Sequence, residues 1–88
     1  MAAPDPPPEL TVRVRLFAGL REAMGWAEQR LTTATGTTPA TLWPQLDPPD
    51  GDALPATVRV AINQQFADPA TPLADGDELA FLPPISGG

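Results

Sequence analysis

The strongest constraint on the fold is the run of residues 10–16, in which apolar and polar residues alternate strictly. Side chains that alternate in this way point to opposite faces of an extended chain, so one face is buried and the other is exposed. The run therefore predicts a half-buried β-strand. Its buried face carries Leu10, Val12, Val14 and Leu16.

The rest of the chain divides into short segments separated by turns rich in glycine, proline and aspartate. Apolar residues recur three and four positions apart over residues 17–24, and Gly25 follows, which predicts an amphipathic helix. A second helix is predicted to begin at Thr38 and Pro39 and to be short or irregular, because Pro44 interrupts it. Further strands are predicted at residues 27–34, 57–63, 65–67 and 78–82.

The length of 88 residues allows one domain, and without cysteine this small core must be held by packing alone. The order of strands and helices predicts an α+β fold, a small mixed sheet with one main helix packed on one face. Residues 1–9, rich in proline, are expected to form an extended amino-terminal tail. The domain is expected to span residues 10–82, and residues 83–88 to form a flexible carboxyl-terminal tail.

The composition excludes several function classes. The chain has no cysteine and no histidine, which excludes zinc fingers, thiol nucleophiles and imidazole bases. A net charge of −6 argues against nucleic-acid binding, which needs a basic patch. There is no apolar run near the ~20 residues that span a bilayer, and residues 1–9 lack the features of a signal peptide. We expect a cytoplasmic protein that binds neither nucleic acid nor membrane.

Two clusters of acidic residues are candidates for acid–base or metal chemistry. Both lie in turns, where aspartate is favoured because it bonds to the backbone, and their spacing misses the calcium-loop pattern. We therefore interpret them as turn residues and predict no metal site and no bound cofactor. The clusters are Asp47, Asp50 and Asp52, and Asp75, Asp77 and Glu78.

The charges are distributed unevenly along the chain. Residues 1–43 contain four acids and four arginines, whereas residues 44–88 contain seven acids and only Arg59, so the whole net charge of −6 falls in the second half. The acidic half can serve as a solvated surface that aids solubility. Alternatively, it can steer the chain toward basic partner surfaces near the carboxyl terminus.

The chain ends Phe81-Leu-Pro-Pro-Ile-Ser-Gly-Gly88, directly after the last predicted strand. Pro83 and Pro84 stiffen the chain where it leaves the last predicted strand. The six residues 83–88 can reach about 20 Å beyond the fold. Gly87 and Gly88 have no side chains, so the end of the chain can enter a channel too narrow for other residues. The final carboxylate is for the same reason sterically accessible for reaction. In the last strand both faces are apolar, so Leu82 and Ile85 either bind a partner or are covered by a nearby loop.

Residues 10–88 resemble the small subunits of molybdopterin synthase, a family of ubiquitin-like β-grasp sulfur carriers. The matching stretches are residues 14–25, residues 60–63 and residues 73–88, which end in Phe-x-Pro-Pro-x-Ser-Gly-Gly. Related thiamine and cysteine-biosynthesis carriers share the Gly-Gly ending but usually lack the double proline. The proline-rich head and the Pro48-Pro49 loop depart from the family pattern, away from the tail.

The resemblance implies that the reactive group is the chain's own terminus, Gly87 and Gly88. An adenylyltransferase similar to ubiquitin-activating enzymes would use ATP and magnesium to adenylate Gly88, and a sulfur donor would convert it to a thiocarboxylate. The tail would enter the large subunit in a heterotetramer, where catalytic side chains reside, and deliver sulfur to cyclic pyranopterin monophosphate. The implied partner-binding residues are Phe81, Leu82, Pro83, Pro84, Ile85 and Ser86.

Two other readings stay open. The chain can be a sulfur carrier for another pathway, such as thiamine, cysteine or tRNA thiolation, with the same activation chemistry. It can also be a non-enzymatic ubiquitin-like interaction domain in which the Gly-Gly ending is incidental.

Overall fold

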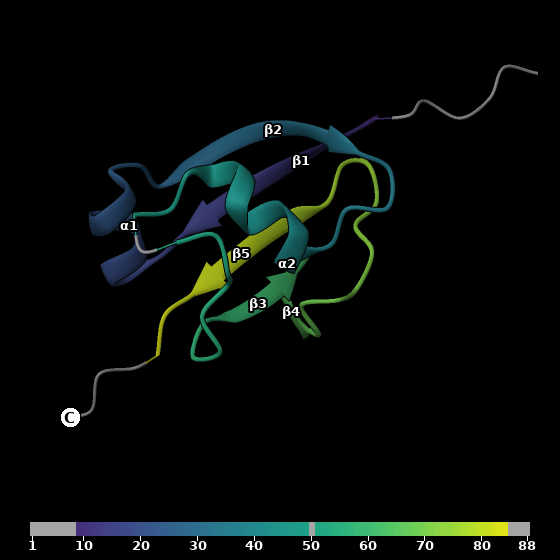
Figure 1. Ribbon diagram of the computed structural model, residues 1–88. Coiled ribbons are helices and arrows are strands. Elements are labelled where there is room, and N and C mark those ends of the chain that lie inside the picture. Colours follow the sequence, from purple (N-terminus) through teal and green to yellow (C-terminus); the bar gives the residue numbers. More distant parts are fainter. Residues whose placement is uncertain (1–8, 50, 85–88) are drawn as a thin grey trace, which may run out of the picture.

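The framework of the protein is a five-stranded mixed sheet, seen in a computed structural model that describes residues 9–49 and 51–84 (Figure 1). Strand order across the sheet is β2-β1-β5-β3-β4. The central strands β1 and β5 are parallel, and every other neighbouring pair is antiparallel. The strands are β1 (Glu9–Leu16), β2 (Glu28–Ala34), β3 (Arg59–Ile62), β4 (Gln65–Ala67) and β5 (Glu78–Leu82).

Three short helical segments accompany the sheet, namely α1 (Ala18–Met24), α2 (Pro39–Leu42) and the 3-10 helix η1 (Trp43–Leu46). Thr38 caps α2 because its hydroxyl accepts the N–H of Thr41, and Thr41 in turn accepts the N–H of Thr38. Pro44 has no N–H for an α-helical bond, so the helix tightens into η1 after one turn. The predicted irregularity of this helix is confirmed.

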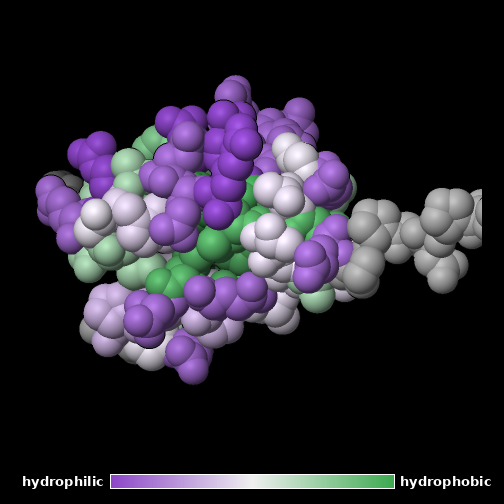
Figure 2. Space-filling view, turned by 90° about the horizontal axis from the view of Figure 1, so that it is seen from above, coloured by the Kyte–Doolittle hydropathy of each residue, from purple (hydrophilic) through white to green (hydrophobic). Residues whose placement is uncertain are grey.

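One face of the sheet packs on α2 and η1 to form the core. Phe81 lies at its centre with no exposed surface, and its ring meets Trp43 edge-on at a centroid distance of 4.9 Å. Viewed from above, hydrophobic residues lie in the middle of the molecule between hydrophilic side chains (Figure 2). The buried strand residues include Leu10, Val12, Val14, Leu16, Val60, Leu79 and Phe81.

The α+β prediction is confirmed, since a mixed sheet with central parallel strands and helices on one face is the β-grasp arrangement. The expected strand at 57–63 is shorter than predicted, because Val58 closes a turn to Pro55 and Asn63 adopts a left-handed backbone. The first strand begins one residue early, at Glu9. In the described ranges, no helix has the length and apolar character needed to cross a membrane.

Candidate functional site

The face of the sheet opposite α2 and η1, called the outer face below, carries the candidate site. Cross-strand register decides which side chains share it, because paired residues project to the same side. One row crosses all five strands, since Arg15 pairs with Glu28 on one side and with Ala80 on the other, Ala80 pairs with Ala61, and Ala61 with Phe66. The next row pairs Leu82 with Arg59.

These rows, together with Phe17 at the start of α1, bring apolar side chains from four parts of the chain into one cluster. The cluster borders an open hollow of about 240 Å³. Phe66 is 66% exposed, and it is the only large hydrophobic side chain exposed to this degree among the described residues. We call this cluster the apolar patch, and it consists of Phe17, Ala61, Phe66, Ala80 and Leu82.

Two arginines lie against the aromatic rings of the apolar patch. The guanidinium carbon of Arg59 lies 4.4 Å from the ring centroid of Phe66, and that of Arg15 lies 5.0 Å from the centroid of Phe17. Cation–π contacts of this kind hold exposed rings in place while the positive charge stays in water. The patch is therefore an apolar surface whose rim carries Arg15 and Arg59 together with one acid, Glu78, which lies 3.7 Å from Arg15.

The carboxyl-terminal tail leaves the fold beside this patch. Strand β5 ends at Leu82, Pro83 is half-buried and Pro84 is exposed. Leu82 is half-buried on the outer face, where it lines the hollow beside the apolar patch. The other predicted tail residues, Ile85, Ser86, Gly87 and Gly88, lie outside the described residues.

One predicted partner-binding residue needs correction. Phe81 has no exposed surface and fills the core against Trp43, so its side chain cannot contact a partner. Alternation along β5 explains the error, because a residue one position before Leu82 must point to the opposite face. Phe81 therefore supports the site from behind by fixing the strand that carries Leu82.

Of the patch residues, the sequence predicted only Leu82 as a site residue; it missed Ala61, Ala80 and both aromatic residues. Phe17 was interpreted as part of a helix face, and Phe66 as part of a short edge segment. A local signal for Phe66 exists, because Asn63 and Gln64 form a two-residue turn whose hairpin register sets Phe66 opposite Ala61. No local pattern connects Phe17 to this surface.

Asp75 and Asp77 serve the turn before β5, as predicted, whereas Glu78 is the first residue of β5 and pairs with arginines. Asp75 Oδ1 accepts the N–H of Thr11 at 2.7 Å, and Asp77 Oδ2 accepts the N–H of Ala74 at 2.8 Å. Asp77 Oδ1 also accepts Asn63 Nδ2 at 2.9 Å. Within the described part of the chain, no three potential ligand side chains gather in a way that could hold a metal ion.

The linear charge count did not predict the character of this surface. Most acids of the second half lie in turns and loops, but Glu78 lies in β5 and lines the same hollow as Arg15, and Arg59 lies over Phe66. Folding thus places basic side chains beside the exit of the tail. A partner that docks here meets Arg15, Arg59 and Glu78 around the patch, so its rim is less acidic than the chain as a whole.

The chain matches a known protein family over most of its length. Residues 14–88 match the model of the ThiS family. The molybdopterin synthase sulfur carrier subunit of Chlamydomonas reinhardtii is 35% identical over 83 residues, covering 90% of this chain and 100% of that protein.

Solved structures show the same relationship. The crystal structure of H. volcanii small archaeal modifier protein 1 has a TM-score of 0.73 and 27% identity, covering 86% of this chain and 99% of that one. One chain in a complex of subunits 1 and 2 of molybdopterin-converting factor from Helicobacter pylori has a TM-score of 0.57 and 27% identity, covering 90% of this chain and 100% of that one. The chain therefore belongs to the ThiS family and is related along most of its length to ubiquitin-like sulfur carriers.

Proposed function

We propose that this chain is the sulfur-carrier subunit of a molybdopterin synthase. The observation that carries the proposal is the apolar patch beside the point where β5 passes into the Pro83-Pro84 exit. A carrier needs such a surface because the partner must hold the domain while the tip of the tail reaches a reaction centre. Relatives named as molybdopterin synthase sulfur carrier subunits support the same assignment.

The chemistry we assign takes place at the carboxylate of Gly88. An adenylyltransferase related to ubiquitin-activating enzymes uses ATP and magnesium to convert this carboxylate to an acyl adenylate. A sulfur donor then displaces AMP and leaves a thiocarboxylate, which delivers its sulfur to cyclic pyranopterin monophosphate. No side chain of this chain acts as acid, base or nucleophile in these steps; the activating enzyme supplies such groups for adenylation, and the large subunit supplies them for sulfur transfer.

In this proposal the apolar patch docks on the large subunit and the tail enters it. The H. pylori complex of subunits 1 and 2 supports a two-subunit assembly. Two carriers on a dimeric large subunit form the proposed heterotetramer. Leu82 has the central position, since it is both a member of the patch and the last strand residue before the tail.

Intact mass spectrometry tests the carrier chemistry directly. After incubation with the activating enzyme, ATP, magnesium and a sulfur donor, we expect the mass to rise by the replacement of one oxygen by one sulfur. A variant that lacks Gly87 and Gly88 is the control and stays unmodified. An unmodified wild-type chain, under conditions that charge a known carrier, contradicts the proposal.

A second experiment distinguishes the acceptor. In a strain that lacks this chain, the wild-type gene is expected to restore molybdoenzyme activity, and the gene without the two terminal codons is not. Restoration by both genes points to an interaction domain with an incidental Gly-Gly ending. Sulfur loading without any restoration points to a carrier for another pathway, such as thiamine, cysteine or tRNA thiolation.

A further inference from the structure

Four of the chain's five arginines project from the outer face, although the chain has a net charge of −6. Arg15 and Arg59 flank the apolar patch. Arg13 on β1 and Arg30 on β2 are direct cross-strand partners and lie further along the sheet. Only Arg21, on α1, lies elsewhere.

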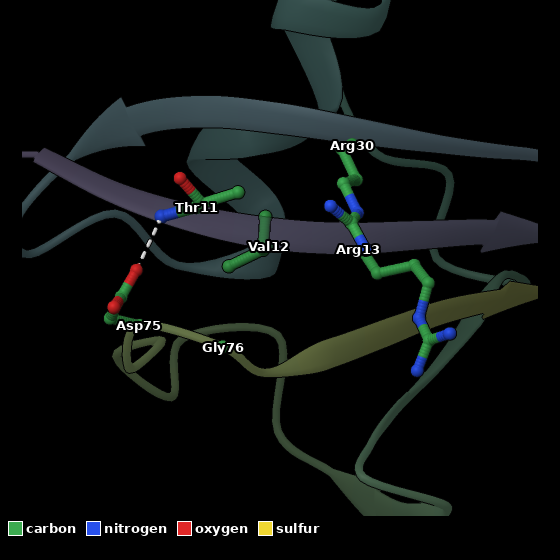
Figure 3. A pocket seen from close by; sticks show the side chains of 6 residues that line it. All are labelled: Thr11, Val12, Arg13, Arg30, Asp75 and Gly76. Carbon is green, nitrogen blue, oxygen red and sulfur yellow. Dashed lines mark hydrogen bonds between the residues drawn. The ribbon is translucent and has the colours of Figure 1, made fainter.

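Arg13 and Arg30 line an open hollow of about 330 Å³ between the two strands and the turn at Asp75 (Figure 3). The only acid that lines it, Asp75, accepts the N–H of Thr11 at 2.7 Å. Figure 3 shows Asp75 turned toward Thr11 and apart from both guanidinium groups. The acid therefore fixes the turn and leaves the two arginines unneutralised by it.

The other acids nearby neutralise this pair only in part. Arg13 Nη2 and Arg15 Nη1 both lie 3.7 Å from Glu78 Oε1, so the two arginines share one acid. The side chain of Arg13 is 51% exposed. Within the described residues, no ion pair joins Arg30 to an acid. Arg30 is also the direct cross-strand partner of Arg13. Like charges in this position lower the stability of a sheet, so stability of the fold does not explain the pair.

We propose that Arg13 and Arg30 bind a carboxylate side chain of the protein that docks on the apolar patch. The inference rests on the proposed function and adds a second contact to that docking surface. Arg13 pairs with Glu78, four residues before Leu82, so this contact lies about 13 Å along the sheet from the exit of the tail. A partner that covers both positions is held at two points, which fixes the direction in which the tail enters.

A protein carboxylate fits this site better than a free anion. Guanidinium groups present paired N–H donors that match the two oxygens of a carboxylate. Two exposed arginines in an open hollow hold a free ion weakly. A carboxylate on a partner already bound at the patch has a high effective concentration, so the same contact becomes favourable. Arg15 links the two regions, since it lies on the same face as Arg13 and lines the patch.

The test measures association of the full-length chain with the large subunit of molybdopterin synthase from the same organism by stopped-flow mixing. Arg30→Glu is expected to lower the association rate constant about tenfold at low salt, with a smaller difference at high salt. Arg21→Glu makes the same charge change outside the outer face and is expected to leave the rate within about twofold of wild type. Arg30→Gln, which removes one charge without adding another, is expected to fall between them. Thermal unfolding of each variant confirms that the fold is intact.

The outcomes separate the inference from the proposed function. Equal rates for Arg30→Glu and Arg21→Glu overturn the carboxylate site, while binding of the wild-type chain preserves the proposed function. Failure of the wild-type chain to bind the large subunit rejects the proposed function and the inference with it. Rescue of Arg30→Glu by an acid-to-arginine change in the large subunit confirms the contact. If inorganic phosphate binds the wild-type chain and competes with the large subunit, the hollow is a small-anion site and the proposal is overturned.

Discussion

Phe81 and Leu82 are adjacent in β5, yet they lie on opposite faces of the sheet. Phe81 has no exposed surface and contacts Trp43 in the core, whereas Leu82 is half-buried on the outer face beside the tail. One residue therefore supports the fold and its neighbour supports docking. This separation makes the two functions of β5 independently testable.

Phe81→Ala is expected to lower the free energy of unfolding by about 3–5 kcal/mol, because it leaves a cavity at the centre of the core. Leu82→Ser is expected to cost no more than about 1 kcal/mol, since the side chain is only half-buried. Urea denaturation of both variants measures the difference. If Phe81→Ala does not fold, Phe81→Leu, which removes less volume, gives the smaller loss. Equal losses for Phe81→Leu and Leu82→Ser contradict the assignment of faces.

Asn63 is expected to stabilise the link between the β3–β4 turn and β5. Its side chain donates to Asp77 Oδ1 at 2.9 Å and accepts the N–H of Glu78 at 3.0 Å, and its φ is 52°. Asn63→Ala loses both bonds in a left-handed backbone, so we expect a loss of about 2 kcal/mol in thermal or urea unfolding. Asn63→Gly loses the bonds without the steric cost and is expected to lose about 1 kcal/mol. Equal losses of unfolding free energy in Asn63→Ala and Asn63→Gly show that the left-handed backbone at this position does not affect stability.

Gln64 offers a stabilising substitution at the next position. Its φ of 69° is costly for a residue with a Cβ, and glycine adopts this angle freely. Gln64→Gly is expected to raise the free energy of unfolding by about 0.5–1 kcal/mol, after allowing for the extra entropy of glycine in the unfolded chain. Gln65→Gly, one residue later in β4, is the matched control and is expected to destabilise, because glycine weakens a strand. A lower free energy of unfolding for Gln64→Gly than for the wild-type chain contradicts this prediction.

The cap of α2 gives a fourth test. Thr38 Oγ1 accepts the N–H of Thr41 at 3.2 Å, and Thr41 Oγ1 accepts the N–H of Thr38 at 2.8 Å. Thr38→Ala is expected to lower the free energy of unfolding by about 1 kcal/mol, as measured by urea denaturation. Thr38→Ser keeps the hydroxyl and is expected to lose much less. A comparable loss in both variants assigns the effect to the methyl group of Thr38 instead of the cap.

The sequence alone predicted the strands, the helices and the fold class, because these depend on local periodicity. Strict alternation over residues 10–16 required a strand buried on one face, whereas β5 was predicted from a short apolar run after a turn. Pro44 predicted that the second helix is short, because proline has no N–H to donate and this interrupts the helix within one turn. The Gly-Gly ending and its two prolines are likewise visible without any structure.

Only the tertiary structure decided which side chains form the docking surface. Phe17, Phe66 and Leu82 come from distant parts of the chain, and they meet because β5 pairs in parallel with β1 and antiparallel with β3. The separate β1–β2 pairing sets Arg30 opposite Arg13, which brings two basic side chains together in an acidic chain. Linear charge counts and single-strand patterns contain no information on cross-strand neighbours, since these depend on how strands from different parts of the chain align.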